Sequence, residues 1–176
     1  MTIVNFPRAL LWPVLATCLA ACGGGGSSAP APVYGTCTLA LNGYANGQSS
    51  GVDILQNGPT QAASRPLTGC DISQLQSAQL KLCVQHTQIQ ELTAQLTLPV
   101  FSSTLGDLSP DTSASVADIN FCTFNNGSLY TVSLPPSVIS AVSSLNTSWN
   151  VAVVDQISNS NSGKFIGWSL ILTGQK

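Results

Sequence analysis

The stretch Leu80–Pro99, LKLCVQHTQIQELTAQLTLP, decides the fold class. Apolar and polar residues alternate in it on both sides of a break at 87–91. The alternating apolar residues are Leu80, Leu82 and Val84, and then Leu92, Ala94, Leu96 and Leu98. Because a period of two puts every second side chain on the same face of a strand, this stretch predicts two strands that each bury one face.

The same alternation returns three times further along the chain. It runs through Tyr130, Val132 and Leu134, through Trp149, Val151 and Val153, and through Trp168, Leu170 and Leu172. Turn-forming residues separate these runs at 57–59, 125–127, 135–136 and 158–163. The pattern predicts an all-β domain over residues 34–176, an antiparallel β-sandwich of the jelly-roll, galactose-binding-like kind.

Helical spacing occurs in one place, at Val138, Val142 and Leu145. We expect a short turn of helix there, or a loop pressed onto the core.

The first 21 residues predict a signal peptide. They contain one basic side chain, Arg8, followed by an apolar run. The run is shorter than the roughly 20 apolar residues that a membrane span needs. A Gly/Ser/Pro-rich segment over residues 22–33 follows, and its composition predicts a flexible tether.

The junction of leader and tether, Leu19-Ala20-Ala21-Cys22, resembles the bacterial lipobox. The resemblance implies that Cys22 becomes the first mature residue and carries a diacylglycerol and an acylated amine. Gly23 after it resembles the pattern sorted to the outer membrane of Gram-negative bacteria. The alternative is a plain secretory signal with a cysteine near its cleavage site.

The charge balance argues against two classes of partner. Only 7% of the residues are charged and the formal net charge is −2. Such a chain, without a cluster of Lys or Arg, lacks the basic surface that nucleic acids require. The same property argues against electrostatic attraction to anionic lipid headgroups.

Four cysteines follow the tether, Cys37, Cys70, Cys83 and Cys122. An even number in an exported chain predicts two disulfides, in any of three pairings. Zinc binding by these cysteines is disfavoured, because there is no Cys-x-x-Cys pair and His86 is the single histidine.

Two segments resemble the P domain, also called the P/Homo B domain, a β-sandwich of kexin- and furin-like convertases and of many bacterial secreted proteins. The segment 82–99 is similar to a family segment in which a strand is followed by His-Thr, a short turn, Asp-Leu, a second strand and a Pro. Glu91 stands at the position of the family's Asp. The segment 148–174 is similar to the family's closing hairpin. The resemblance implies a noncatalytic domain with structural roles for His86, Thr87, Trp149, Asp155, Gly163 and Trp168.

The candidates for chemistry are few. A Ser-His-Asp hydrolase would have to use His86 with Asp107 or Asp118, but no Gly-x-Ser-x-Gly elbow occurs, so a structural hydrogen bond of His86 is the preferred interpretation. Asp107, Asp111, Asp118 and Asp155 could bind calcium. No EF-hand spacing is present, and for Asp155 a turn cap is preferred.

The sequence therefore predicts a noncatalytic, lipid-anchored envelope protein without a cofactor, calcium excepted. Its sandwich is expected to bind a protein partner or to support envelope structure. The alternatives are an accessory partner of a secreted subtilisin-like protease and a calcium-dependent adhesion module.

Overall fold

The computed structural model describes residues 30–41, 51–56, 58–61 and 64–176. Every element named below lies in one compact unit, Pro32–Lys176. The predictions for the signal peptide and for Cys22 lie outside the described residues. No helix in the described part of the chain is long and apolar enough to cross a membrane.

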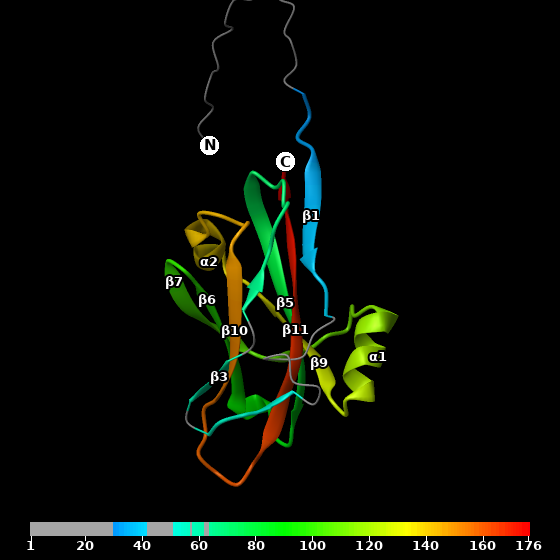
Figure 1. Cartoon of the computed structure of the whole chain (residues 1–176), viewed down its shortest axis with the longest axis vertical. Helices are drawn as coiled ribbons and strands as arrows, with labels where there is room; N and C mark the ends of the chain where they lie inside the picture. Colours follow the sequence, from blue (N-terminus) through cyan, green and yellow to red (C-terminus); the bar gives the residue numbers. More distant parts are fainter. Residues whose placement is uncertain (1–29, 42–50, 57, 62–63) are drawn as a thin grey trace, which may run out of the picture. The chain divides into compact units, whose positions relative to one another are not determined.

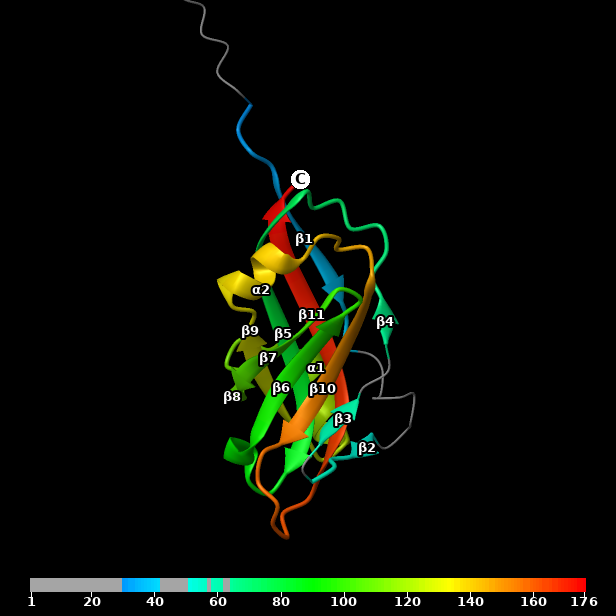
Figure 2. The same cartoon turned by 90° about the vertical axis from the view of Figure 1, so that its left-hand side faces the viewer.

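The fold is an antiparallel β-sandwich of two sheets, as the alternation predicts (Figure 1). Sheet A has the order β1 (Tyr34–Leu39), β11 (Gly163–Gln175), β5 (Gln74–His86), β9 (Ser128–Ser133), β8 (Ser109–Pro110), and β2 (Val52–Asp53) also pairs with β11. Sheet B has the order β3 (Pro59–Gln61), β10 (Ser148–Asp155), β6 (Leu92–Leu98), β7 (Phe101–Asp107), and β4 (Arg65–Pro66) also pairs with β10. Figure 2 shows sheet B in front of sheet A.

The core lies between the two inner faces. The residues that alternate in the sequence are the ones that fill it, and Leu80, Leu82, Leu92, Leu96, Trp149 and Val151 have no exposed surface. Burying one such aliphatic side chain contributes about 1.5–3 kcal/mol. The period of two was therefore sufficient to identify the inward face of each central strand.

A smaller apolar cluster covers part of the outer face of sheet A. A β-bulge between Phe165 and Gly167 leaves Phe165 in the main core and puts Ile166 in this second cluster, with Cys83 and Cys122. The helix α1 (Val116–Phe124), which carries Cys122, lies beside this face in Figure 1.

Two short helices complete the fold. The 3₁₀ helix η2 (Ile89–Glu91) occupies the break between β5 and β6. The helix α2 (Pro136–Ala141) buries Val138 against the core, which confirms the short helical turn expected there. The turn predicted at 158–163 joins β10 to β11.

Candidate functional site

One end of the sandwich is closed by three ionisable side chains, His86, Glu91 and Asp155, and we call it the histidine end. His86 is the last residue of β5, Asp155 is the last residue of β10, and Glu91 ends η2. Their ligand atoms all lie within 4.8 Å of one another. Figures 1 and 2 place the loop between β10 and β11 at this end, with η2 beside it.

The inward direction of two of these side chains follows from the strand period. His86 continues the inward series of Leu82 and Val84, and Asp155 continues that of Val151 and Val153. The His86 and Asp155 side chains are 0% and 1% exposed. One imidazole and one carboxylate, from opposite sheets, thus lie where the hydrophobic core ends.

The imidazole of His86 is held on one side only. Its Nδ1 atom lies 2.9 Å from the carbonyl oxygen of Gln88 and 3.1 Å from the backbone nitrogen of the same residue. Its Nε2 atom is buried and has no hydrogen-bond partner among the described residues. The nearest acid, Asp155 Oδ2, is 3.7 Å from Nε2, which is beyond hydrogen-bond range.

The two carboxylates are fixed by the loop that follows β10. Asp155 Oδ1 accepts a 3.0 Å hydrogen bond from the Ile157 N–H, which confirms the turn cap expected for Asp155. Glu91 accepts hydrogen bonds of 2.9–3.1 Å from the side-chain amides of Asn159 and Asn161. The loop thus holds both acids next to the imidazole.

At the start of β11 the backbone of Gly163 packs so closely against β5 that there is no room for a side chain. A Cβ atom there would lie 2.1 Å from the carbonyl oxygen of Gln85 and 2.6 Å from His86 Cδ2. Any larger residue would displace the histidine. A pocket of about 510 Å³ opens beside this contact, lined in part by His86, Thr87 and Lys164.

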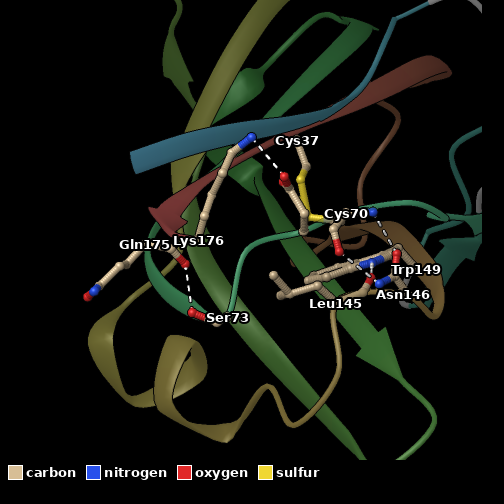
Figure 3. The surroundings of a disulfide bond; sticks show 9 residues. Cys37, Cys70, Ser73, Leu145, Asn146, Trp149, Gln175 and Lys176 are labelled. Carbon is tan, nitrogen blue, oxygen red and sulfur yellow. Dashed lines mark hydrogen bonds and ion pairs between the residues drawn. A yellow bond between two sulfur atoms is a disulfide. The ribbon is translucent and has the colours of Figure 1, made fainter. Parts of the chain in front are cut away.

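The opposite end of the sandwich, which we call the terminal end, is closed by Trp149, Asn146 and the Cys37–Cys70 disulfide (Figure 3). The indole N–H of Trp149 donates a 3.1 Å hydrogen bond to the Leu145 carbonyl. The Asn146 side chain accepts a bond from the N–H of Cys70 and donates one to its carbonyl, both at 2.9 Å. Each of these polar side chains has a partner.

The C-terminus is fastened at the terminal end as well. Figure 3 shows Ser73 donating to the carbonyl of Gln175, at 3.1 Å. Lys176 lies 2.8 Å from Asp71, and its hydrogen bond holds the pKa of that exposed carboxyl below its ordinary value. These contacts tie the end of β11 to the start of β5.

A charged cluster lies under α1 on the outer face of sheet A. Lys81 Nζ lies 3.0 Å from Asp111 Oδ2 and 3.8 Å from Asp118 Oδ2. Burial raises the pKa of Asp111, but hydrogen bonds from Ser113 and Lys81 outweigh it, so the pKa falls below its ordinary value. Asp111 Oδ2 lacks a hydrogen bond of good geometry, yet the adjacent ammonium compensates its charge.

The second disulfide, Cys83–Cys122, fastens α1 to β5 beside this cluster. Gly127 makes room for it, because a Cβ atom there would lie 2.9 Å from the sulfur of Cys83. The two disulfides confirm the prediction from the even cysteine count and select one of its three pairings.

The four aspartates proposed as calcium ligands do not come together. Asp111 and Asp118 are paired with Lys81, Asp107 ends β7 as an exposed residue, and Asp155 lies with His86 and Glu91. The hydrolase hypothesis paired His86 with Asp107 or Asp118. In the structure the acids beside His86 are Asp155 and Glu91 instead.

The family-like positions have identifiable places in the structure. Trp149 and Trp168 are buried in the core, while Thr87 is an exposed residue after β5.

The role of Asn159 and Asn161 was not predicted. Their position in a polar loop directly after Asp155 was the available signal.

No protein-family model and no curated protein sequence matches the chain. Among solved structures, it is similar to a chain of the complex of an Aeromonas sobria serine protease with the chaperone, at 15% identity and a TM-score of 0.48 over 81% of this chain and 27% of that one. It is also similar to the serine protease of Aeromonas sobria, at 14% identity and a TM-score of 0.47 over 84% of this chain and 28% of that one. This chain spans about a quarter of the length of those chains.

Proposed function

We propose that this protein is a lipid-anchored protein of the cell envelope, and that its sandwich is a noncatalytic module that binds a protein partner. The lipobox-like junction at Cys22 is the reason for the anchor. The resemblance of the segments 82–99 and 148–174 to the P domain is the reason for a noncatalytic module.

The observation that carries the binding role is the exposed apolar side of α1. Val116, Ile119 and Phe124 are 73%, 46% and 85% exposed. Their spacing of i, i+3 and i+8 puts them on one side of the helix. Exposed aromatic and aliphatic side chains on a rigid element are typical of protein interfaces. The Cys83–Cys122 disulfide supplies the rigidity.

The binding role is tested by photo-crosslinking in intact cells. A photoreactive residue replaces Phe124 in one variant and Val100, a 72% exposed residue in the turn between β6 and β7, in the matched control. We expect a discrete crosslinked product from position 124 and none from position 100. Equal crosslinking at both positions, or none at either, would contradict the proposal.

The anchor is tested by intact mass spectrometry of protein purified from bacterial membranes. We expect Cys22 to be the first residue and to carry acyl chains, and the protein to sediment with the outer membrane. The Cys22→Ala variant is expected to be free of lipid and released from the membrane fraction. An unmodified wild-type protein would overturn the lipoprotein assignment.

A second candidate function is that of an accessory partner of a secreted subtilisin-like protease, which the resemblance of the hairpin 148–174 favours. It predicts that the purified protein raises the melting temperature of such a protease from the same cell, and that changing Phe124 to Ser weakens the effect. A protease whose melting temperature is unaffected would exclude this candidate.

A further inference from the structure

The histidine end contains an unsatisfied atom that its own network does not explain. If Nδ1 of His86 donates to the Gln88 carbonyl at 2.9 Å, the lone pair of the ring is on Nε2 and points toward a carboxylate. If Nδ1 instead accepts from the Gln88 N–H at 3.1 Å, then Nε2 carries a proton whose nearest acceptor is 3.7 Å away. Nε2 is unsatisfied in both tautomers, and a buried polar atom without a partner is costly.

The first tautomer is the arrangement found in metal sites. A histidine that binds a metal usually donates its other ring N–H to a backbone carbonyl or carboxylate, which fixes the ring and exposes the remaining lone pair. The contact between Nδ1 and the Gln88 carbonyl is of that kind. Two acceptors that face each other, Nε2 and Asp155 Oδ2, are then stabilised by a cation between them.

The carboxylates keep free lone pairs for such a cation. Asp155 uses Oδ1 for the Ile157 N–H, so Oδ2 remains available. Glu91 accepts three hydrogen bonds from the two asparagines, while a carboxylate offers about four acceptor positions. The two acids are also held in place before a metal binds. The Gln156 N–H donates a 2.8 Å hydrogen bond to the Glu91 carbonyl and so joins the two segments that carry the acids.

We propose that His86, Glu91 and Asp155 bind a divalent transition-metal ion of the zinc class. The imidazole decides the class, since calcium and magnesium sites are built from oxygen ligands, whereas imidazole suits zinc and its neighbours. Zinc takes nitrogen and oxygen ligands at about 2.0–2.2 Å, which puts tetrahedral ligands about 3.4 Å apart. The 3.7 Å between Nε2 and Oδ2 needs little adjustment to reach that value.

The site places a metal where the two sheets meet, with one ligand from each sheet and one from η2. A metal there joins sheet A to sheet B, and neither described disulfide does so, because Cys37–Cys70 links β1 to the loop before β5 and Cys83–Cys122 links β5 to α1. With three protein ligands, the fourth position of a tetrahedral zinc ion is left for water. The expected role is to stabilise the contact between the two sheets, and it does not depend on the binding role proposed for α1.

Calorimetric titration with zinc chloride tests the proposal on the whole protein, purified in detergent and freed of metal with a chelator. We expect one zinc ion per chain. Changing His86 to Gln or Asp155 to Asn is expected to weaken binding by at least about 100-fold, beyond the 10–100-fold typical of outer-shell changes. The matched control, Asp107→Asn, changes an exposed acid and should bind zinc as the wild type does.

A titration with calcium chloride separates the two classes of ion. Calcium at the same concentration should not displace zinc. Calcium binding that needs Asp155 but tolerates His86→Gln would overturn the proposal in favour of an oxygen site. Zinc binding that no variant weakens would overturn it as well.

A spectroscopic test on the wild type avoids any doubt about folding of the variants. Because His86 is the single histidine, two-bond ¹H–¹⁵N spectra contain one imidazole. Zinc is expected to leave Nδ1 protonated and to shift the Nε2 resonance. An imidazole protonated on both nitrogens in the presence of zinc would show that a proton occupies the gap, and would contradict the proposal.

Discussion

The two ends of the sandwich are built from similar materials and closed in different ways. At the terminal end, Trp149 and Asn146 each have hydrogen-bond partners, and a disulfide crosses nearby. At the histidine end, a buried imidazole nitrogen has no partner in the described part of the chain, although it faces a buried carboxylate.

This difference separates two uses of buried polar groups. A satisfied network such as that of Asn146 stabilises the fold by itself, because each donor meets an acceptor. A half-satisfied network contributes little until something fills it. The terminal end is therefore expected to set the stability of the free protein, and the histidine end its response to a ligand.

The largest effect is expected from Trp149 at the terminal end. Trp149→Ala removes a fully buried side chain together with its bond to the Leu145 carbonyl. The expected loss is about 3–5 kcal/mol in the free energy of unfolding, measured by urea denaturation. Val100→Ala, in an exposed turn, serves as the control. A loss below about 1 kcal/mol, the size of an ordinary substitution, would show that the terminal end does not set stability.

The disulfides come next, and they can be compared directly. Their sequence separations of 33 and 39 residues are similar, so restriction of the unfolded chain is expected to stabilise by about 2–4 kcal/mol in each case. Replacing Cys83 and Cys122 by Ser should cost more than replacing Cys37 and Cys70, because the first pair is fully buried. Chemical denaturation of the two double variants tests this order, and the reverse order would contradict it.

The charged cluster under α1 is a case in which the buried charges are paired. In the unfolded chain an aspartate titrates at about pH 3.9, and the pKa of Asp111 in the folded protein lies below that of the unfolded chain. Its ion pair therefore stabilises the fold above about pH 4, and this contribution is lost as the pH falls through the folded-state pKa.

Asp111→Asn is accordingly expected to cost about 1.5–3 kcal/mol in unfolding free energy at neutral pH, as for a hydrogen bond to a charged group. It should also flatten the loss of stability below pH 4, roughly the range in which the carboxylate titrates. Urea unfolding midpoints measured from about pH 7 down to about pH 2.5 give both the loss of stability at neutral pH and the shape of the acid profile. Parallel acid profiles of the variant and the wild type would contradict this account of Lys81 and Asp111.

The smallest effect is expected at the histidine end without metal. Asp155→Asn keeps an oxygen that can accept from the Ile157 N–H and removes a charge that has no close hydrogen-bonded cation. The change in unfolding free energy should stay within about 1 kcal/mol, because relief from burying a charge offsets the weaker hydrogen bond to the Ile157 N–H. Thermal unfolding in the presence of a chelator measures it, and a loss comparable to that of Trp149→Ala would abolish the distinction between the two ends.

The sequence predicts the central part of the fold well and the edges poorly. The alternation through Leu80–Leu98 and the hairpin 148–174 identified the strands that bury one face. The edge strands β2, β4 and β8 contain two residues each, which is too short for any periodicity to show. The helix α1 was missed, because its outward side is apolar as well and hides the amphipathic pattern.

Two of the three members of the candidate site could be predicted from the sequence, but not that they come together with Glu91. Asp155 was identified through the resemblance to the P domain, and His86 through the same resemblance and as the single histidine. Continuing the period of two by one step in β5 and β10 would have placed His86 and Asp155 on the inner face. That they meet at one end of the core, with Glu91, depends on the pairing of β10 with β6 and of β5 with β11, which periodicity does not contain.

The most direct test of the difference between the two ends is a crystal structure of the protein grown with zinc, with data collected at the zinc absorption edge. An anomalous peak about 2.0–2.2 Å from His86 Nε2 and from the carboxylates of Glu91 and Asp155 is the predicted result. The terminal end should show none. A map without a peak at the histidine end, with His86 Nε2 bonded instead to a water or to Asp155, would show that this end is a structural closure like the other.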